Sequence, residues 1–505
     1  MTSRDLQLPS VAIDLAGQRL SYPELDTLGE IRVQQRVSLP TQCELTFFDA
    51  PPPDSPLSSV VVGLTLEVWL QSEPLFKGEI TALEYGYEPS RGRTWRVRGY
   101  DPLHRLRQRQ PVRAHVQVDL AGLARQLVQD IGVAVETPPN NGFWRYLIQH
   151  GQTDLEFLTR RAEACGCFFA LQGDRLRFFS LEGDGPSVSL ALGETLLEAR
   201  VEVNGDGVCG EVSAGGWNPL SGEAHAGRAS VARVGRQVSA RVPPEWIGGS
   251  IERFLVSEVL QDDRHAESLA QAELDRRAMR EVTFWGVAEG DARLCPGVSV
   301  ELGGVTPELA GRYVLTEATH ILDSEHRFIT EISTRLTPPS RPAGSASMLL
   351  GVVTAVNDPE HLGRVKVRLP TCENLETDWV QVMTVGAGAG KGIIALPDLD
   401  DRVLVLCAQQ DPAQGIVIGG LYGMAGSPDS GVEGEAVKRF TILTPGGQRV
   451  RLDDQNKAVR VENSAGSYVE LLPGEVVLHS AAPLRIEAPG QSVVIRGKAI
   501  NFEEA

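Results

Sequence analysis

Residues 458–502 read AVRVENSAGSYVELLPGEVVLHSAAPLRIEAPGQSVVIRGKAINF, with apolar residues two apart in very short runs. This alternation predicts six strands, each burying one face, at 459–461, 469–471, 476–478, 484–486, 493–495 and 500–502. Every interval between them contains glycine or proline, the residues that most often form turns. The pattern predicts a winding repeat with a turn at every step.

These strands are too short to form a core within one chain. A three-residue strand spans roughly 10 Å, and repeat units of this size gain stability by stacking on neighbours. Other copies of the chain are the obvious neighbours, so we expect an intertwined β-prism, most simply a homotrimeric β-helix, which closes its sheet edges. The expected core residues are Val459, Val461, Val469, Leu471, Leu478, Leu484, Ile486, Val493 and Ile495.

The composition limits the class of protein. A chain of 505 residues exceeds the roughly 250–300 residues at which a single core stops growing, so we expect several domains. The net charge of -18 argues against a general nucleic-acid binder. The seven cysteines are odd in number and scattered, which disfavours a disulfide framework and favours assembly in the cytoplasm. The sequence indicates no signal peptide, no membrane helix and no cofactor.

Strand patterns dominate and indicate a mainly β protein. We expect a first β-barrel at 1–118 with a proline loop at 51–53, and a second β-barrel at 196–336. A helical and hairpin insertion at 119–195 separates them. A Pro/Ser/Gly linker at 337–347 precedes an OB-type barrel at 348–425 and the repeat at 426–505.

Local signals place individual elements. Asp119 can cap a helix at 120–130, and Thr153 with Glu156 forms a capping box ahead of a second helix. A hairpin is expected at 168–179, and a further helix at 265–280. The five strands expected in the OB-type barrel are 351–356, 364–369, 379–383, 403–408 and 416–418.

Several separated segments are similar to one protein family, the spike proteins of contractile injection machines. This family includes VgrG of type VI secretion, phage tail spikes and the spikes of extracellular contractile injection systems. The segments that resemble its OB domain are GVVTAVNDPEHLGRVKVRLP (351–370), WVQV (379–382), ALPDLDDRVLVL (395–406) and DPAQGIVIGGLY (411–422). Those that resemble its hub, which has two β-barrels per chain, are FKGEITALEYGYEPSRGRTWRVRGYDPLHRLRQRQ (76–110) and IQHGQTDLEFLTRRAEACGCFFALQGDRLRFF (148–179).

The resemblance implies a structural role and no enzymatic activity. Family members are trimers whose hub sits in a baseplate under an inner tube, and whose needle carries a cone protein with a PAAR motif. We therefore expect a homotrimeric spike that punctures a target envelope, with tube, baseplate and PAAR-type partners and effector cargo as a further candidate. Two barrels per chain would give six per trimer, adapting a threefold spike to a sixfold tube. Such a particle would be assembled in the bacterial cytoplasm and thrust out on firing.

The chain also departs from some relatives. Fewer than twenty residues separate Tyr422 from Phe440, which leaves no room for the glycosidase domain that some phage relatives insert there. The chain stops almost on its last predicted strand, which favours an extracellular injection system over type VI secretion. The alternative function is a tail-associated cell-wall hydrolase, but no nucleophile elbow, HExxH motif or Cys/His signature supports it. A receptor-binding fibre is a weaker alternative.

Three motifs invite a chemical interpretation. The glycine-rich segment before Lys391 lacks the glycine and the Ser/Thr of a phosphate-binding loop, because Val385 and Gly392 occupy those positions. Cys165 and Cys167 lack a second pair of metal ligands. The residues His320 and His326 have no matching carboxylate motif. In each case an ordinary structural role is favoured.

Two sets of residues are candidates for contacts with partners. The segment 91–113 holds eight arginines, of which Arg96 and Arg98 share one face of a predicted strand. They could neutralise phosphates, but the acidic chain favours a contact with an acidic neighbouring subunit or a solvated face. At the C-terminus, Ile500, Asn501 and Phe502 either close the core of the prism or form a docking plate for the PAAR-type partner.

Overall fold

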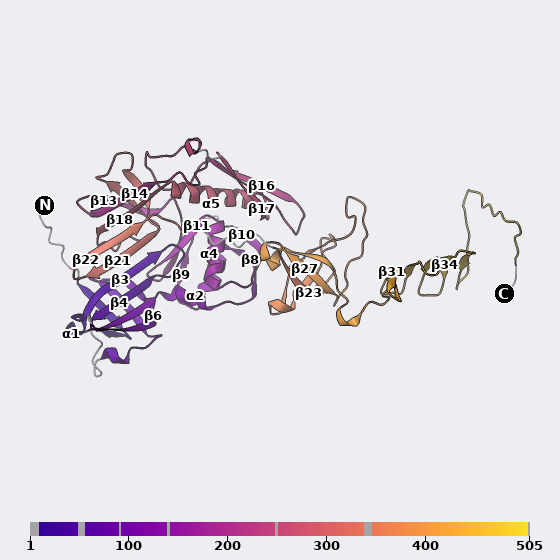
Figure 1. Cartoon of the computed structure of the whole chain (residues 1–505), viewed down its shortest axis with the longest axis horizontal. Coiled ribbons are helices and arrows are strands. Elements are labelled where there is room, and N and C mark those ends of the chain that lie inside the picture. The colour runs from indigo at the N-terminus through magenta and orange to yellow at the C-terminus, as the bar shows by residue number, and fades with distance from the viewer. Residues whose placement is uncertain are drawn as a thin grey trace. The chain divides into compact units, whose positions relative to one another are not determined.

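The computed structural model describes residues 10–48, 56–89, 92–138, 142–247, 251–337 and 346–502. The chain divides into a first unit, Met1–Leu421, and a second unit, Tyr422–Ala505 (Figure 1). The proline loop predicted at 51–53 and residues 338–345 of the predicted linker lie outside the described residues. The prediction of a mainly β protein is confirmed.

One large sheet joins strands between residues 11 and 333 of the first unit, the region expected to form the hub. Its eleven strands, in spatial order, are β14 (Leu196–Val203), β18 (Val282–Glu289), β22 (Arg327–Ser333), β21 (Glu317–Asp323), β3 (Leu28–Arg36), β4 (Gln42–Phe48), β7 (Gly92–Tyr100), β6 (Glu73–Glu88), β5 (Thr65–Leu70), β1 (Val11–Leu15) and β2 (Gln18–Arg19). Strand β3 pairs antiparallel with β21, which lies far away in sequence. The strands predicted as two barrels therefore share one sheet.

Each half of this sheet has its own hydrophobic core. The first packs Phe47 and Trp95 together, with ring centroids 5.1 Å apart, beside Val97. The second packs Phe284 against Tyr313, with ring centroids 5.5 Å apart. Three further strands complete the second half, namely β13 (Asp184–Ala191), β19 (Val298–Gly303) and β20 (Gly311–Val314).

The insertion has a hydrophobic core of its own, formed by both helices and strands. Its elements are β8 (Arg113–Asp119), α3 (Leu120–Val128), β9 (Ala134–Glu136), β10 (Phe143–Gln149), α4 (Asp154–Ala164), β11 (Cys167–Gln172) and β12 (Arg175–Ser180). The predicted caps are confirmed, because Asp119 accepts from the backbone N–H of Gly122 at 2.7 Å and Thr153 forms a capping box with Glu156. The predicted hairpin is β11 and β12.

The short helices α1 (Tyr22–Leu25) and α2 (Arg105–Gln108) lie in the hub, and the predicted long helix is α5 (Asp263–Glu281). Three strands pack on α5 around a small apolar core, namely β15 (Glu211–Trp217), β16 (Ala224–Ala229) and β17 (Glu252–Val259).

The OB barrel ends the first unit. Its strands, in spatial order, are β25 (Leu375–Glu376), β24 (Lys366–Leu369), β23 (Ser347–Ala355), β27 (Arg402–Cys407), β28 (Gly415–Gly420) and β26 (Gln381–Val382). The backbones of Val365, next to β24, and Val380, next to β26, bond to each other at 3.0 and 2.9 Å, which closes the barrel. All five predicted strands are present, and the ends of β24, β26, β27 and β28 lie within two residues of the prediction, whereas β23 begins four residues earlier than predicted, at Ser347.

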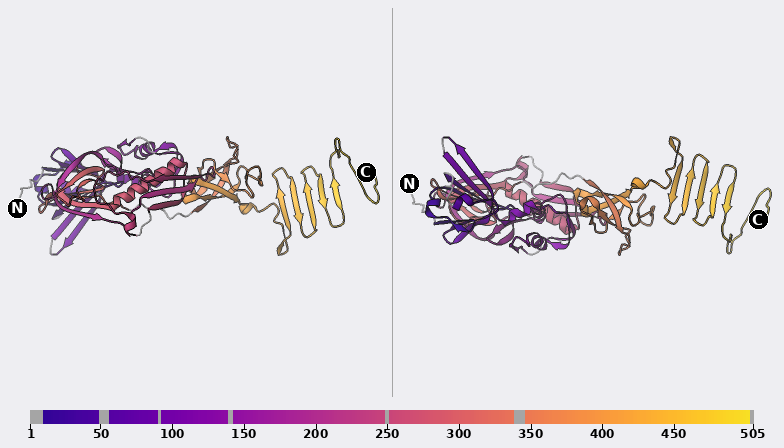
Figure 2. Two further views of the ribbon diagram at one scale, coloured as in Figure 1. Left: turned by 90° about the horizontal axis from the view of Figure 1, so that it is seen from above. Right: turned by 90° about the horizontal axis from the view of Figure 1, so that it is seen from below.

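The second unit contains an antiparallel meander that Figure 2 shows as a row of yellow arrows. Its strands are β31 (Arg439–Leu443), β32 (Arg449–Asp453), β33 (Ala458–Glu462), β34 (Tyr468–Leu471) and β35 (Val476–His479), preceded by the small hairpin β29 (Val432–Glu433) and β30 (Ala436–Val437). The strands predicted at 459–461, 469–471 and 476–478 are confirmed. Two further strands, β31 and β32, were not predicted.

The strands predicted at 484–486, 493–495 and 500–502 are wrong for the chain by itself. Residues 480–502 contain no helix or strand in the structure. A strand needs a hydrogen-bonded neighbour, and no strand among the described residues pairs with this segment. The meander of one chain also does not wind into the predicted β-helix.

Candidate assembly interface

The register of the meander gathers its apolar residues on one side. Directly opposite residues in antiparallel strands point to the same face, so the five strands align two rows of five side chains. One row is Phe440, Leu452, Val459, Leu471 and Val476, and the next is Ile442, Val450, Val461, Val469 and Leu478. These ten residues are called the apolar face below.

The apolar face is uncovered in the single chain. Ile442 is 70% exposed, Val476 is 69% exposed and Leu478 is 57% exposed. A soluble protein rarely leaves so many adjacent apolar side chains in water unless they meet a partner. The apolar face is therefore a candidate interface.

The opposite face of the meander satisfies its own charges. Arg460 bonds to Glu462 at 2.7 Å and to Glu470 at 3.4 Å, and its guanidinium lies 3.9 Å from the ring of Tyr468. The Tyr468 ring stacks on His479 with centroids 4.9 Å apart. These cross-strand pairs fix which face of the meander meets water.

The predicted core residues divide into two groups. Val459, Val461, Val469, Leu471 and Leu478 lie together on the apolar face. Leu484, Ile486, Val493 and Ile495 lie in the segment without regular structure and are between 53% and 63% exposed.

Sequence reasoning missed five members of the apolar face, namely Phe440, Ile442, Val450, Leu452 and Val476. The alternation in RFTIL and RVRLD carried the same signal as the strands that were predicted.

At the C-terminus, the three residues predicted to bind a tip partner are exposed. Phe502 is 91% exposed and Ile500 is 49% exposed, and Asn501 lies between them without regular structure. Their role stays a prediction.

The predicted arginine pair lies on the outer face of β7, where each side chain meets a carboxylate of its own chain. Arg96 bonds to Glu84 at 3.2 Å. Arg98 bonds to Glu44 at 3.0 Å and lies 4.0 Å from Glu84. These carboxylates balance the arginine charge, which weakens the case for phosphate binding. A contact with a neighbouring subunit stays a prediction.

The segment 351–370 owes part of its pattern to a turn in the OB barrel. Asp358 accepts two hydrogen bonds from Arg364, at 2.9 and 2.8 Å, and two more from the backbone N–H groups of Glu360 and Leu362. The hydrogen bonds from Arg364 hold the pKa of Asp358 well below its usual range. This pair stabilises the fold of the barrel.

The insertion is bonded to the OB barrel. Arg161 in α4 meets Asp411 at 3.4 Å, and Arg145 in β10 meets Asp378 at 3.2 Å. The hydroxyl of Tyr146 donates to the backbone carbonyl of Glu376. The first unit thus holds its OB barrel through several polar contacts.

Comparison with known proteins identifies the family of this chain. Residues 34–325, more than half of the chain, match the family model described as phage tail baseplate hub (GPD). The chain belongs to this family of baseplate hub proteins. Residues 349–422 of the hub protein also match the model described as type VI secretion system/phage-baseplate injector OB domain. The resemblance to VgrG and phage tail spikes is confirmed.

Solved structures share the fold of this hub protein at low sequence identity. The E. coli c3393 protein, described as a component of the type VI secretion system similar to T4 tail proteins gp27 and gp5, is 14% identical with a TM-score of 0.50. That match covers 81% of this chain and 99% of the other. A chain of the half-lidded Francisella PdpA–VgrG complex is 9% identical with a TM-score of 0.55, covering 94% of this chain and 89% of the other.

A search of curated protein sequences found no match to the hub protein. The two family descriptions name a hub and an injector OB domain, and neither names an enzyme. None of the helices in the described residues has the length and hydrophobicity that a membrane span requires.

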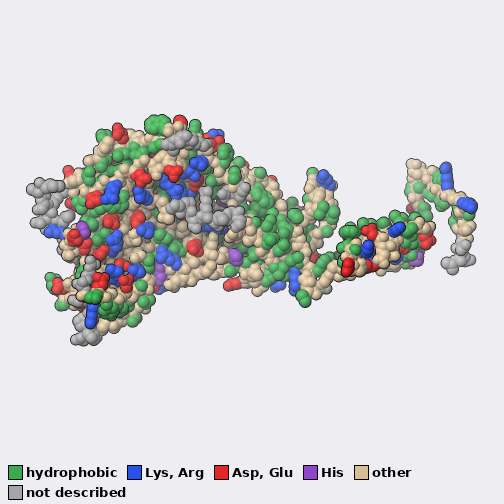
Figure 3. Space-filling view, viewed as in Figure 1, with side chains coloured by type: hydrophobic (Ala, Val, Ile, Leu, Met, Phe, Trp, Pro, Cys, Tyr) green, Lys and Arg blue, Asp and Glu red, His purple; other side chains and the backbone are tan. Residues whose placement is uncertain are grey.

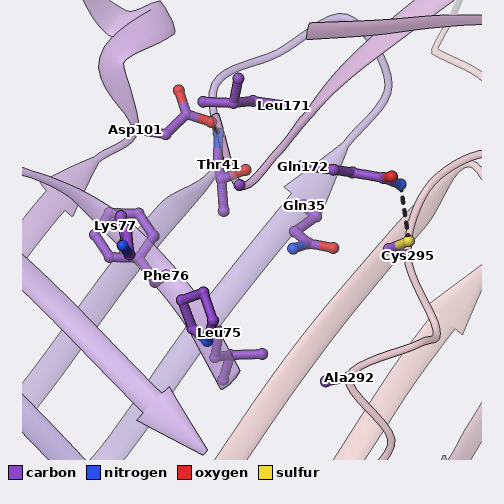
Figure 4. Close-up of a pocket in the computed structure, with 12 residues that line it drawn as sticks. Gln35, Thr41, Leu75, Phe76, Lys77, Asp101, Leu171, Gln172, Ala292 and Cys295 are labelled. Atoms are coloured by element: carbon purple, nitrogen blue, oxygen red, sulfur yellow. Dashed lines mark hydrogen bonds between the residues drawn. The ribbon is translucent and has the colours of Figure 1, made fainter. Parts of the chain in front are cut away.

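A pocket in the hub tests the hydrolase alternative (Figure 4). Among its described lining residues, Asp101 is the one acid, and Gln172 and Cys295 bond to each other at 3.1 Å. Burial raises the pKa of Asp101 to about 6, and its oxygens accept from the backbone N–H groups of Thr41 and Leu103. Glycoside hydrolysis needs two carboxyl groups roughly 5–10 Å apart. This lining does not supply them.

The other motifs have structural roles in the hub protein. Burial raises the pKa of Cys165 to about 12 and of Cys167 to about 11, so both are neutral thiols at physiological pH. His320 is fully buried and bonds to the hydroxyl of Thr330 at 3.0 Å. The backbones of Gly388 and Lys391 bond to each other in a tight turn, so these amides do not cradle an anion.

Proposed function

We propose that three copies of this hub protein associate through their apolar faces to form the homotrimeric spike of a contractile injection machine. The observation that carries the proposal is the apolar face, because nine of its ten residues are exposed in the described part of the single chain. Three such sheets around a common axis would turn every apolar face inward. Such a prism would bury the apolar faces and remove free sheet edges.

Association would also give residues 480–502 the strand partners that they lack. Apolar residues still alternate there, at Leu484 and Ile486 and again at Val493 and Ile495. Strands from neighbouring copies could pair with these runs and extend the prism towards the C-terminus. The needle predicted at 426–505 would then include them, and its end would present Ile500, Asn501 and Phe502 to a PAAR-type tip protein.

The hub would join this needle to the inner tube within the baseplate. Each chain has two cores along one sheet, linked where β3 pairs with β21. Three chains would present six such halves, which matches the requirement for seating a sixfold tube on a threefold spike. The needle would concentrate the contractile force on a small area and puncture the target envelope.

The mass of the intact protein in solution tests the proposal, with two variants on neighbouring positions of β35. Leu478→Asp introduces a charge on the apolar face, whereas Val477→Asp places the same charge on the polar face. We expect a trimer for the native protein and for Val477→Asp, and single chains for Leu478→Asp. Sedimentation analysis measures all three. A native protein that sediments as a single chain would refute the proposal.

A further inference from the structure

The OB barrel carries apolar side chains on both faces of three neighbouring strands. Val353, Val405 and Val417 point inward and are at most 1% exposed. The alternate residues point outward and form a strip across the barrel, in which Met348 opposes Leu406 and Leu350 opposes Leu404, with Ile416 beside Leu406. These five outward residues are called the acceptor face below. Hydrophobic side chains gather over this barrel in Figure 3.

Strands that are apolar on both faces are typical of sheets covered on both sides. The acceptor face does not have this cover in the single chain. Met348 is 63% exposed and Leu350 is 40% exposed, while Leu404, Leu406 and Ile416 are half-buried. Some other segment is needed to exclude water from it.

The same barrel carries an apolar segment that lacks a surface to pack on. Residues 383–399, called the arm below, contain no helix or strand. The backbone N–H of Met383 donates to Val417 at 2.8 Å, and that of Ile393 donates to Val385 at 3.1 Å, so the arm folds back on itself. Val385 is 73% exposed and Ile394 is 89% exposed. The arm therefore presents apolar side chains to water.

We infer that the arm of one copy packs on the acceptor face of the next copy around the spike. This inference rests on the trimer proposed above. The base of the arm is bonded to β28, which contributes Ile416 to the acceptor face and ends at Gly420, two residues before the second unit begins. Copies joined through their second units would therefore hold the OB barrels, with their arms and acceptor faces, near one another.

A cyclic arrangement explains why both surfaces are left uncovered by their own chain. Each copy offers one arm and one acceptor face, so a contact from each copy to the next uses every surface once and closes after three copies. The contact would be apolar on both sides. It would lock the barrels together independently of the needle.

Photo-crosslinking of the full chain tests the inference. Ile394 is replaced by the photoreactive amino acid p-benzoylphenylalanine, and ¹⁵N-labelled and unlabelled chains are mixed under denaturing conditions and refolded together. We expect crosslinks from the arm to peptides containing 347–351, 402–407 or 415–420, in mixed-label pairs that prove a contact between copies. The same substitution at Val231, which is 73% exposed in the hub, should give no crosslinks to these peptides.

A second variant measures the strength of the contact. Ile394→Asp should weaken each of the three arm contacts in the trimer about tenfold, since burying a charge in an apolar contact costs at least the roughly 1.4 kcal/mol per contact that a tenfold change represents. Val231→Asp is the matched control and should leave association unchanged.

The outcomes separate the two proposals. A trimer with crosslinks between copies and a weakened Ile394→Asp variant supports the inference. A trimer whose crosslinks stay within one chain, or do not form, overturns the arm contact and leaves the trimeric spike intact. A single-chain mass for the native protein overturns both.

Discussion

The hub sheet formed by β3, β4, β7 and β6 and the meander of the second unit share one pattern, with paired charges on one face and apolar side chains on the other. In the hub, Phe47 is 1% exposed and Trp95 is fully buried. In the meander, Ile442 is 70% exposed and Val461 is 50% exposed. The pattern within each strand is alike, and the difference lies in what covers the apolar side.

The two regions differ in which residues bury the apolar side of the sheet. In the hub, other strands bring Ile13, Leu66 and Val68 into the same core as the aromatic pair, so one chain completes the core. The meander consists of consecutive strands in a single layer, and the described residues add no second layer to it. The stability of the hub should therefore be independent of protein concentration, whereas that of the meander should depend on it.

Phe47→Ala should produce the largest loss of stability. Removing a buried phenylalanine costs about 3–5 kcal/mol through lost burial and the cavity that remains. We expect this loss at every protein concentration, because one chain forms the whole hub core. All seven tryptophans lie before residue 380, so urea unfolding followed by tryptophan fluorescence reports the first unit.

The adjacent residue supplies the control for that measurement. Phe48 is 58% exposed, and Phe48→Ala should shift the free energy of unfolding by less than about 1 kcal/mol. A shift for Phe47→Ala that grows on dilution would show that other copies support the hub core.

Asp358→Asn should give the next largest loss of stability. It tests whether the OB barrel, like the hub core, is stabilised by contacts within one chain. At neutral pH, removing one member of the buried pair with Arg364 should cost roughly 3 kcal/mol. Because Arg364 holds the pKa of Asp358 low, the native pair contributes its stabilisation above the ordinary aspartate pKa of about 4, and this contribution is lost as pH falls below that value.

Urea unfolding at pH 7 and at pH 3 measures this pH dependence. The difference between native protein and Asp358→Asn should be smaller at pH 3, at all protein concentrations. An equal difference at both values would mean that the carboxylate charge does not stabilise the barrel.

Local signals in the sequence predicted much of the first unit. The capping residues Asp119 and Thr153 begin helices where expected, because a cap acts on the backbone within a single turn. The OB strands were predicted from alternation, and the segment around Asp358 owes its pattern to a local turn. These features depend on residues close together in sequence.

Features that depend on distant residues could not be predicted in this way. The pairing of β3 with β21 joins the two halves of the hub, and no periodicity within either strand specifies its partner. The carboxylates beside Arg98 come from β4 and β6, so the sequence around the arginine did not reveal them. The strand signal at Leu484 and Ile486 was present, yet strands did not form, since pairing depends on a partner as well as on alternation.

Arg98→Glu should give the smallest loss of stability among these variants. It tests whether the charges on the outer face of the hub sheet pair only with charges of their own chain. The new carboxylate would lie beside Glu44 and Glu84, and repulsion at this partly exposed site should cost about 0.5–1 kcal/mol. Combining it with Glu44→Arg restores an opposite-charge pair and should recover most of the loss in urea unfolding.

The sedimentation mass of the same variants separates a role within the chain from a role between copies. If Glu44 is the main partner of Arg98, both the single and the double variant should keep the native trimer mass, because the apolar face is unchanged. A trimer lost in Arg98→Glu and not recovered by Glu44→Arg would mean that a carboxylate of a neighbouring copy competes for Arg98. In that case the charged face of the hub sheet, like the apolar face of the meander, would be completed by other chains.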